Sequence, residues 1–365
     1  MGEIHLIPAL IVAFAVSSAF MIALRPVAKS IGLIDRPGGR KEHVVDVPVV
    51  GGLAMFGGAV AGLILLHGPS EMLVSIFVAS SLLVLIGALD DRFGLPLSVR
   101  LATQVAAVLF MAYGGDLQLF TIGDPFGTGE VSLGAFTLLF TLMVAVTIIN
   151  AYNLVDGDDG LAGSLALIAF LAVAVVAGAG SVFGAISLTV AAGIVGFLLY
   201  NFPVVWNRSV HSFMGDAGST LLGFTVLWIT ISISQGPERL ISPMHCLWFA
   251  SIPIYDSLTC FVRRSLQGSS SFSPGRDHFH HMLKRGGFHV YQILGILTGL
   301  QVVYAAIGVV GHFAGVPDVV LFVAWSGLGL IQRTVIRAIS TARRRTILRQ
   351  IQEGFLDPSR EPQRV

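Results

Sequence analysis

The sequence has few charged residues. Asp, Glu, Lys and Arg make up 12% of its 365 residues, about half the share of roughly 25% that is typical of a soluble domain. Hydrophobic residues make up 54%, and the mean hydropathy is +0.82. So little charge cannot cover a core of this size with a hydrated surface. This excludes a soluble globular protein and indicates a chain surrounded by lipid.

The net charge is small and cysteines are few, and no leader sequence is expected. The formal net charge is only +1, so the chain has no overall field to attract nucleic acid, and no nucleic-acid partner is expected. Its two cysteines, Cys246 and Cys260, lie in one apolar run, which excludes a disulfide framework and favours packing roles. The first residues lack the basic start and the small-residue cleavage site of a secretory signal, so no cleavable signal peptide is expected.

Long apolar runs are abundant instead. A helix needs roughly 20 apolar residues to cross the hydrocarbon core of a bilayer, and the sequence offers eleven such candidates. We therefore predict an all-α integral membrane protein with about eleven transmembrane helices. This count requires the glycine-rich junction Ala177–Gly180 to be a turn between two spans. The runs lie near residues 4–24, 50–67, 72–89, 99–114, 133–150, 161–179, 181–200, 214–233, 244–262, 291–311 and 317–337.

The basic residues orient these spans. Placing the N-terminus outside puts every Lys and Arg except Arg239 on the inner side, and cytoplasmic segments carry such an excess. We therefore predict an external N-terminus, a cytoplasmic C-terminus, a membrane domain over 1–337 and a basic cytoplasmic tail over 338–365. Near anionic lipid each tail arginine would contribute on the order of 1 kcal/mol, so loss of the tail should lower membrane abundance more than activity.

Acidic residues gather at the predicted inner ends of the spans. Taken singly, each has an ordinary explanation as a solvated or capping residue at a helix end. Together they converge on one depth of the membrane, where carboxylates without partners are costly. Oxygen-only ligands suit a hard divalent cation, so we predict Mg²⁺, with Mn²⁺ as an alternative, bound together with a phosphate-bearing substrate. The group comprises Asp90, Asp91, Asp156, Asp158, Asp159 and Asp216.

Two further motifs lie on the same predicted face. In NAYNLVDGDDGLAGS, Asn150, Asn153 and Asp156 follow at steps of three and share a helix face, and glycines then break the helix. A polar turn would explain Gly and Asp but not two carboxamides at a span end, so we favour a ligand site. After a flexible QGSSSFSPG stretch come Arg276, His278, His280 and His281. Zinc binding and a plain basic loop are the alternatives there. The acidic cluster on the same face favours donors to phosphate oxygens.

These motifs resemble the polyprenyl-phosphate N-acetylhexosamine-1-phosphate transferases, and most closely their WecA-type members, which act on undecaprenyl phosphate and N-acetylglucosamine. The resemblance covers most of the chain. It rests on four strings in family order, DDRFG, NAYNLVDGDDGLAGS, FMGDAGST and SPGRDHFHHML. Phe279 interrupts the histidines, whereas the related MraY-type enzymes carry a more compact run. This moves the expected donor away from UDP-MurNAc-pentapeptide but does not separate the N-acetylhexosamines from one another.

The resemblance implies a role for each matching residue. Asp90 and Asp91 resemble the pair near the lipid phosphate, and Asn153 and Asp216 resemble magnesium-site residues. Asp156 and Asp159 fall in the loop associated with catalysis and the nucleotide, with Asp159 facing uridine. The histidines resemble the motif that engages the diphosphate. The catalytic candidates are Asp90, Asp91, Asp156, His278, His280 and His281, the substrate-binding candidates are Asn150, Asn153, Asp159, Arg100 and Arg276, and the metal ligands are Asp216 and Asn153.

The expected reaction moves N-acetylglucosamine 1-phosphate from its UDP ester to undecaprenyl phosphate and releases UMP. It would occur at the cytoplasmic face of a bacterial inner membrane and would initiate an O-antigen, enterobacterial common antigen or teichoic-acid type of polysaccharide. Another UDP-N-acetylhexosamine or UDP-MurNAc-pentapeptide is the alternative donor, and a homodimer is an allowed assembly. The alternative outside enzymes is a cation-coupled transporter, although carrier sites lie near the midplane rather than at span ends.

Overall fold

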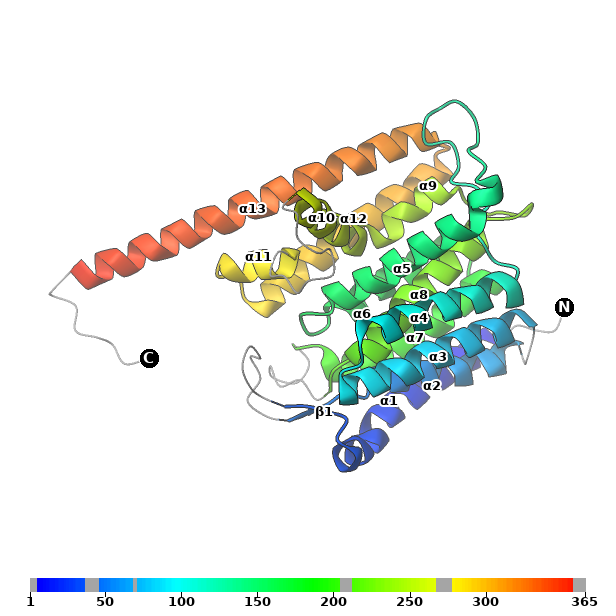
Figure 1. Ribbon diagram of the computed structural model, residues 1–365, viewed down its shortest axis with the longest axis horizontal. Helices are drawn as coiled ribbons and strands as arrows, with labels where there is room; N and C mark the ends of the chain where they lie inside the picture. The colour runs from blue at the N-terminus through cyan, green and yellow to red at the C-terminus, as the bar shows by residue number, and fades with distance from the viewer. Residues whose placement is uncertain (1–4, 37–45, 68–70, 204–211, 267–277, 357–365) are drawn as a thin grey trace.

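The computed structural model describes residues 5–36, 46–67, 71–203, 212–266 and 278–356, and most of them are helical (Figure 1). The helices lie side by side in one bundle, and a two-residue antiparallel strand pair sits at one end of it. The elements are α1 (Leu6–Ile31), β1 (Ile34–Asp35), β2 (Val47–Pro48), α2 (Gly51–His67), α3 (Glu71–Phe93), α4 (Leu97–Leu109), η1 (Phe110–Gly114), η2 (Gly134–Phe136), α5 (Thr137–Val155), α6 (Leu161–Ala177), α7 (Val182–Asn201), α8 (Gly215–Ser234), α9 (Pro243–Cys246), η3 (Leu247–Ala250), α10 (Ser251–Leu266), α11 (Phe279–Arg285), α12 (Val290–Phe313) and α13 (Asp318–Leu356).

The predicted membrane spans coincide with helical segments. Eight helices among the described residues are long and apolar enough to cross a membrane, and α2 and α6 are shorter apolar helices. The glycine-rich junction is a turn, as predicted: α6 ends at Ala177, Gly178 has φ 79°, and Ser181 caps α7 by accepting the Gly184 N–H. The all-α membrane class is therefore confirmed, while the total of eleven crossings stays a prediction.

The ninth predicted span is not one straight helix. It divides into α9, the 3₁₀ turn η3 and α10, and Figure 1 shows α10 nearly end-on while α9 follows the bundle. Pro253 lies in the first turn of α10 and has no N–H to donate. The Gln301 side chain of α12 bonds the backbone groups at the break, accepting from Ile252 N–H at 2.9 Å and donating to the carbonyls of Trp248 and Phe249 at 3.1 and 2.9 Å. A bend in an apolar environment requires such partners for its backbone.

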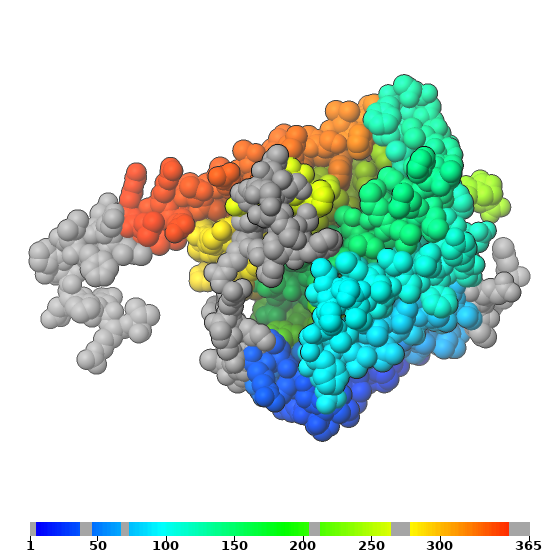
Figure 2. Space-filling model, viewed as in Figure 1, coloured from blue at the N-terminus to red at the C-terminus, as the bar shows by residue number. Residues whose placement is uncertain are grey.

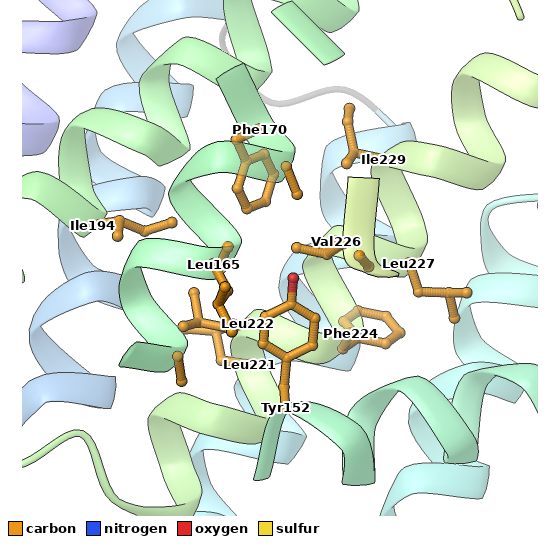
Figure 3. Packing of buried hydrophobic residues seen from close by; sticks show 14 of the residues in the cluster. Tyr152, Leu165, Phe170, Ile194, Leu221, Leu222, Phe224, Val226, Leu227 and Ile229 are labelled. Atoms are coloured by element: carbon orange, nitrogen blue, oxygen red, sulfur yellow. The ribbon is translucent and has the colours of Figure 1, made fainter. Parts of the chain in front are cut away.

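The core is built mainly around α8. The helix is buried along most of its length between α3, α5, α6 and α2. Figure 3 shows Tyr152, from the last turns of α5, among Leu165 of α6 and Leu222 and Phe224 of α8. Asn150 and Asn153 are only partly buried, whereas Tyr152 is fully buried. The last turns of α5 therefore have an apolar side that faces the core and a polar side that faces away from it.

Short backbone pairings fix the start of α8. Phe213 N–H donates to the Pro48 carbonyl at 3.0 Å, and Gly51 and Gly52 N–H donate to the Phe213 and Met214 carbonyls at 3.0 and 3.1 Å. Along α3, a Cβ on Gly87 would lie 2.5 Å from the Ala217 Cα, so only glycine allows α3 and α8 to approach this closely. The contact brings the end of α3 to the start of α8.

Helix α13 continues well past the predicted last span. It is unbroken from Asp318 to Leu356, so no helix end marks the predicted boundary at residue 337. Its C-terminal part projects beyond the bundle (Figures 1 and 2), at the end opposite to the start of α1. An odd number of membrane crossings requires the start of α1 and the end of α13 to lie at opposite ends of the bundle in this way. The assignment of the projecting end to the cytoplasm rests on the charge distribution.

Candidate active site

A pocket opens where the ends of α3, α4, α5 and α8 meet. Arg100 of α4 lies between two carboxylates, with its Nη1 3.3 Å from Asp90 Oδ2 and 3.4 Å from Asp216 Oδ2. The Nε of the same guanidinium is buried and has no hydrogen-bond partner among the described residues. A cationic group with a spare buried donor suits an anionic ligand such as a phosphate. The lining residues are Leu83, Ile86, Gly87, Asp90, Arg100, Thr103, Gln104, Asn150, Asn153, Asp216 and Thr220.

The two adjacent aspartates at the end of α3 have different environments. Asp90 lines the pocket, and its Oδ1 accepts the Leu95 N–H in the turn after α3. Asp91 accepts the backbone N–H groups of Asp216 at 2.8 Å and Ala217 at 3.3 Å, so it caps the N-terminus of α8. In this structure the acceptor atoms of Asp91 are used to hold Asp216 in place, and Asp90 is the member of the pair that faces the pocket.

The two asparagines of α5 support the pocket from the other side. Asn153 Nδ2 donates to Asp216 Oδ1 at 2.6 Å and to Ser219 Oγ at 3.0 Å, so its carbonyl oxygen takes no part in these bonds. Asn150 Nδ2 donates to Gln104 Oε1 at 2.8 Å and to the Val146 carbonyl at 2.7 Å. Asn150 therefore ties α5 to α4, while Asn153 stands directly beside the carboxylate.

The residues present fit a hard divalent cation. Asp216 offers a carboxylate, Asn153 offers an amide oxygen, and Asp90 adds a second carboxylate that shares one guanidinium nitrogen with Asp216. All are oxygen donors, as Mg²⁺ and Mn²⁺ prefer. The metal assignment remains an expectation that rests on this donor set.

The turn between α5 and α6 links the pocket to the histidine helix α11. Lys284 Nζ lies 2.6 Å from Asp158 Oδ1, and Asn201 Oδ1 accepts the Gly160 N–H at 2.7 Å. A Cβ on Gly157 would lie 2.4 Å from His280 Nε2, so glycine is needed for the ring to approach the backbone. Burial, followed by the charges of Asp216 and Asp159, holds the pKa of Asp156 well above its usual range. The turn therefore connects the two parts of the site, the pocket and the histidine helix α11.

The three histidines of α11 have unequal surroundings. His278, at the N-cap of α11, is buried, and its Nδ1 lies 2.9 Å from Asp256 Oδ2. His280 is 1% exposed, and its Nδ1 has no partner among the described residues. Burial, with the charges of His281 and His278, holds the pKa of His280 well below its usual value, and burial with His278 also lowers the pKa of His281. His280 is therefore neutral near pH 7.

The extension of α13 packs against the far end of α11. A Cβ on Gly286 would lie 2.8 Å from the Ser340 Cα, and one on Gly287 would lie 2.6 Å from Ile347 Cδ1. The Arg343 guanidinium stacks over the Phe288 ring at 4.1 Å. Although predicted as an electrostatic tail, this segment also supports the histidine helix.

Arg343→Ala should lower turnover per folded molecule by about fivefold, because loss of a cation–π contact worth about 1 kcal/mol loosens α11. Arg344→Ala is the matched control, since it removes the same charge from a neighbouring exposed residue. Measuring membrane abundance and turnover separately tests this. Equal turnover in the two variants would show that these arginines act only through lipid.

The structure brings most predicted site residues together. Asp90, Arg100, Asn150, Asn153 and Asp216 line one pocket. Asp156 and Asp159 lie in the adjoining turn, and the histidines pack beside it. Arg276 lies outside the described residues, and the individual roles stay predictions. Sequence reasoning missed Asp256, Asn201 and Lys284 as supporting residues. A carboxylate inside an apolar run, as at Asp256, is a signal that could have found the first of them.

A bundle of membrane-length apolar helices thus carries an acidic, arginine-bridged pocket at one end. Similarity to known proteins gives its class, a membrane glycosyl transferase. Residues 73–234 match the model of Glycosyl transferase family 4, and the chain belongs to this family. The relatives it resembles are named undecaprenyl-phosphate alpha-N-acetylglucosaminyl 1-phosphate transferase. The protein of Escherichia coli K12 is 37% identical over 86% of each chain, that of Yersinia pestis 37% over 83% of each, and that of Haemophilus influenzae 33% over 84% of this chain and 86% of its own. The resemblance stated from the motifs is therefore confirmed.

Proposed function

We propose that this chain transfers N-acetylglucosamine 1-phosphate from UDP-N-acetylglucosamine to undecaprenyl phosphate and releases UMP. The observation that carries the proposal is the meeting of an acidic, arginine-bridged pocket and a histidine helix at one end of a membrane bundle. The names of the relatives support the two substrates. A location in the inner membrane, with the site facing the cytoplasm, follows from the predicted orientation.

The pocket would bind the acceptor, undecaprenyl phosphate. An oxygen of the lipid phosphate attacks the β-phosphorus of the nucleotide sugar, and the bond to the bridging oxygen breaks as UMP leaves with the electron pair. The lipid phosphate has its second pKa near 6, so it is mostly a dianion at neutral pH and needs little deprotonation. Arg100, with its spare Nε donor, would bind and orient this phosphate. We favour single displacement over a covalent aspartyl intermediate, because the nucleophile arrives already charged and the Asp91 carboxylate caps α8.

The turn between α5 and α6, together with α11, would bind the donor, UDP-N-acetylglucosamine. His278, His280 and His281 would donate hydrogen bonds to the diphosphate, and Asp159 would face the uridine. Asp90, which faces the pocket, would take the proton of any residual monoanion of the lipid phosphate. Asp156 would act from the turn between the pocket and α11. Mg²⁺ or Mn²⁺, held by Asp216 and Asn153, would supply positive charge that offsets the repulsion between the two phosphate groups.

A panel of UDP-sugars assayed with purified protein and undecaprenyl phosphate tests the proposal. We expect UMP release and lipid-linked sugar with UDP-N-acetylglucosamine, less with other UDP-N-acetylhexosamines, and none with UDP-MurNAc-pentapeptide. An Asp216→Asn preparation controls for contaminating enzyme. If no UDP-N-acetylhexosamine yields UMP while proteoliposomes show cation-driven uptake, the protein is a transporter instead. The product would initiate a cell-envelope polysaccharide, and a homodimer stays a prediction.

A further inference from the structure

An acidic side chain that no motif includes contacts the first histidine of α11. Asp256 of α10 is 1% exposed, and its two carboxylate oxygens accept from different groups of one segment. Oδ2 lies 2.9 Å from His278 Nδ1, and Oδ1 accepts the Phe279 N–H at 2.7 Å. One carboxylate therefore fixes both the ring of His278 and the start of the helix that carries His280 and His281.

We propose that Asp256 is a positioning residue that keeps His278 protonated and oriented, so that its second N–H is presented as a permanent cationic donor to the diphosphate. The inference rests on the proposed function of α11. A histidine that shares Nδ1–H with a carboxylate has its tautomer and ring orientation fixed, and the charge on the ring is stabilised. A buried carboxylate in an apolar run is costly unless it is paired in this way.

The electrostatics agree with this geometry. Burial alone would lower the pKa of His278, but the hydrogen bonds to Asp256 and Cys260 and the charge of Asp256 outweigh burial and raise it to about 10. The titratable groups facing His278 are Asp256 and Cys260 from α10 and His280 and His281 from its own helix. From α13, Arg343 lies over Phe288, beyond the other end of α11. The site thus combines a cationic His278 with a neutral His280, two donors of different charge.

A metal ion is the competing explanation for this cluster. The ligand atoms of Asp256, Cys260 and His278 lie within 4.8 Å of one another, and this residue set could hold zinc. The distances favour the ion pair. The 2.9 Å between Nδ1 and Oδ2 is an ordinary charge-assisted hydrogen bond, and Oδ1 already accepts a backbone N–H.

The test compares Asp256→Asn with Cys260→Ala across pH. Asp256→Asn keeps an acceptor for Phe279 N–H but removes the charge, so the His278 pKa should fall to 6.5 or below. We expect kcat/KM of this variant to be at least about 100-fold below wild type at pH 8.5, with the gap closing as the pH is lowered. Cys260→Ala removes only the longer contact, 3.5 Å, to the same nitrogen and leaves the Asp256 charge in place, so it should shift the pH profile much less than Asp256→Asn. Asp256→Glu should restore part of the alkaline activity.

A measurement without substrate separates this inference from the proposed function. The folded-state pKa of His278 exceeds the unfolded value, so the pair stabilises the wild type fully below pH 6.5, and this stability is lost as the pH rises through about 10. In wild type, the Tm should therefore fall as the pH rises from 6.5 through about 10. In Asp256→Asn, the part of this fall that comes from the pair should be absent. If Asp256→Asn does not fold, histidine-labelled wild type compared with His278→Gln by NMR must still show a doubly protonated ring at pH 8. A turnover loss equal at every pH with an unchanged Tm profile, a neutral His278 ring, or stoichiometric zinc lost in Asp256→Asn would each overturn the proposal.

Discussion

Asp216→Asn should reduce turnover by about 1000-fold or more while the protein still inserts in the membrane. The substitution removes an anionic ligand from the predicted cation site and weakens the ion pair with Arg100, whose Nη1 lies 3.4 Å away. Electrostatic stabilisation of this kind typically contributes 10²–10³ or more to the rate. Insertion should be unaffected, since neutralising a carboxylate lowers the cost of placing it in a membrane. Turnover and membrane abundance are measured together over a range of magnesium concentrations.

Asp116→Asn provides the matched control for this experiment. Asp116 is exposed in the loop after η1, and its φ of 48° is one that asparagine tolerates well. We expect wild-type turnover from this variant at every magnesium concentration. If Asp216→Asn kept wild-type activity at limiting magnesium, Asp216 would not be a metal ligand.

His280→Ala should lower turnover by about 100- to 1000-fold, corresponding to about 2.7–4 kcal/mol of transition-state stabilisation. His280 is buried against Gly157, and its Nδ1 lacks a partner among the described residues, so the ring is positioned for a ligand. The affinity for the nucleotide sugar should change less, because charge on the leaving phosphate grows only as the bond breaks. His281→Ala should act in the same direction.

The measurements are turnover, UDP-sugar affinity and bound zinc, with His5→Ala as control. His5 is exposed at the start of α1 and makes no side-chain cap bond, so its loss should leave all three unchanged. Near-normal turnover in both His280→Ala and His281→Ala would contradict a catalytic role for α11. Stoichiometric zinc that is released by either substitution would make α11 part of a metal site.

The fold was largely predictable because the apolar runs dominate the sequence. Ten of the eleven predicted ranges coincide with helices, and the positions of these helices are set by apolar runs and turn residues alone. The break between α9 and α10 was not predicted, although Pro253 was visible. It depends on Gln301, which reaches the freed backbone groups from a distant part of the chain. When the hydrogen-bond partners of a bend come from another helix, the sequence around the bend contains no pattern that predicts it.

The site was predictable where its residues stand at span ends. Asp90, Asn153 and Asp216 lie together because the ends of α3 and α5 and the start of α8 meet at one end of the bundle. The pairings around them were not predictable, since Asp158 with Lys284 and Asp256 with His278 depend on which helices are neighbours. The support of α11 by α13 was hidden for the same reason, because a basic composition indicates lipid contact but not helix packing.

The turn between α5 and α6 sets a fixed spacing within the site. Gly157 faces His280, Asp158 is paired with Lys284, and Gly160 is bound by Asn201, so three of four consecutive positions engage different parts of the protein. Inserting or deleting one residue here would put each of these contacts out of register at once. Variation among related chains should therefore arise from side-chain replacement around this turn, because a change in its length would separate the arginine-bridged pocket from the histidine helix α11.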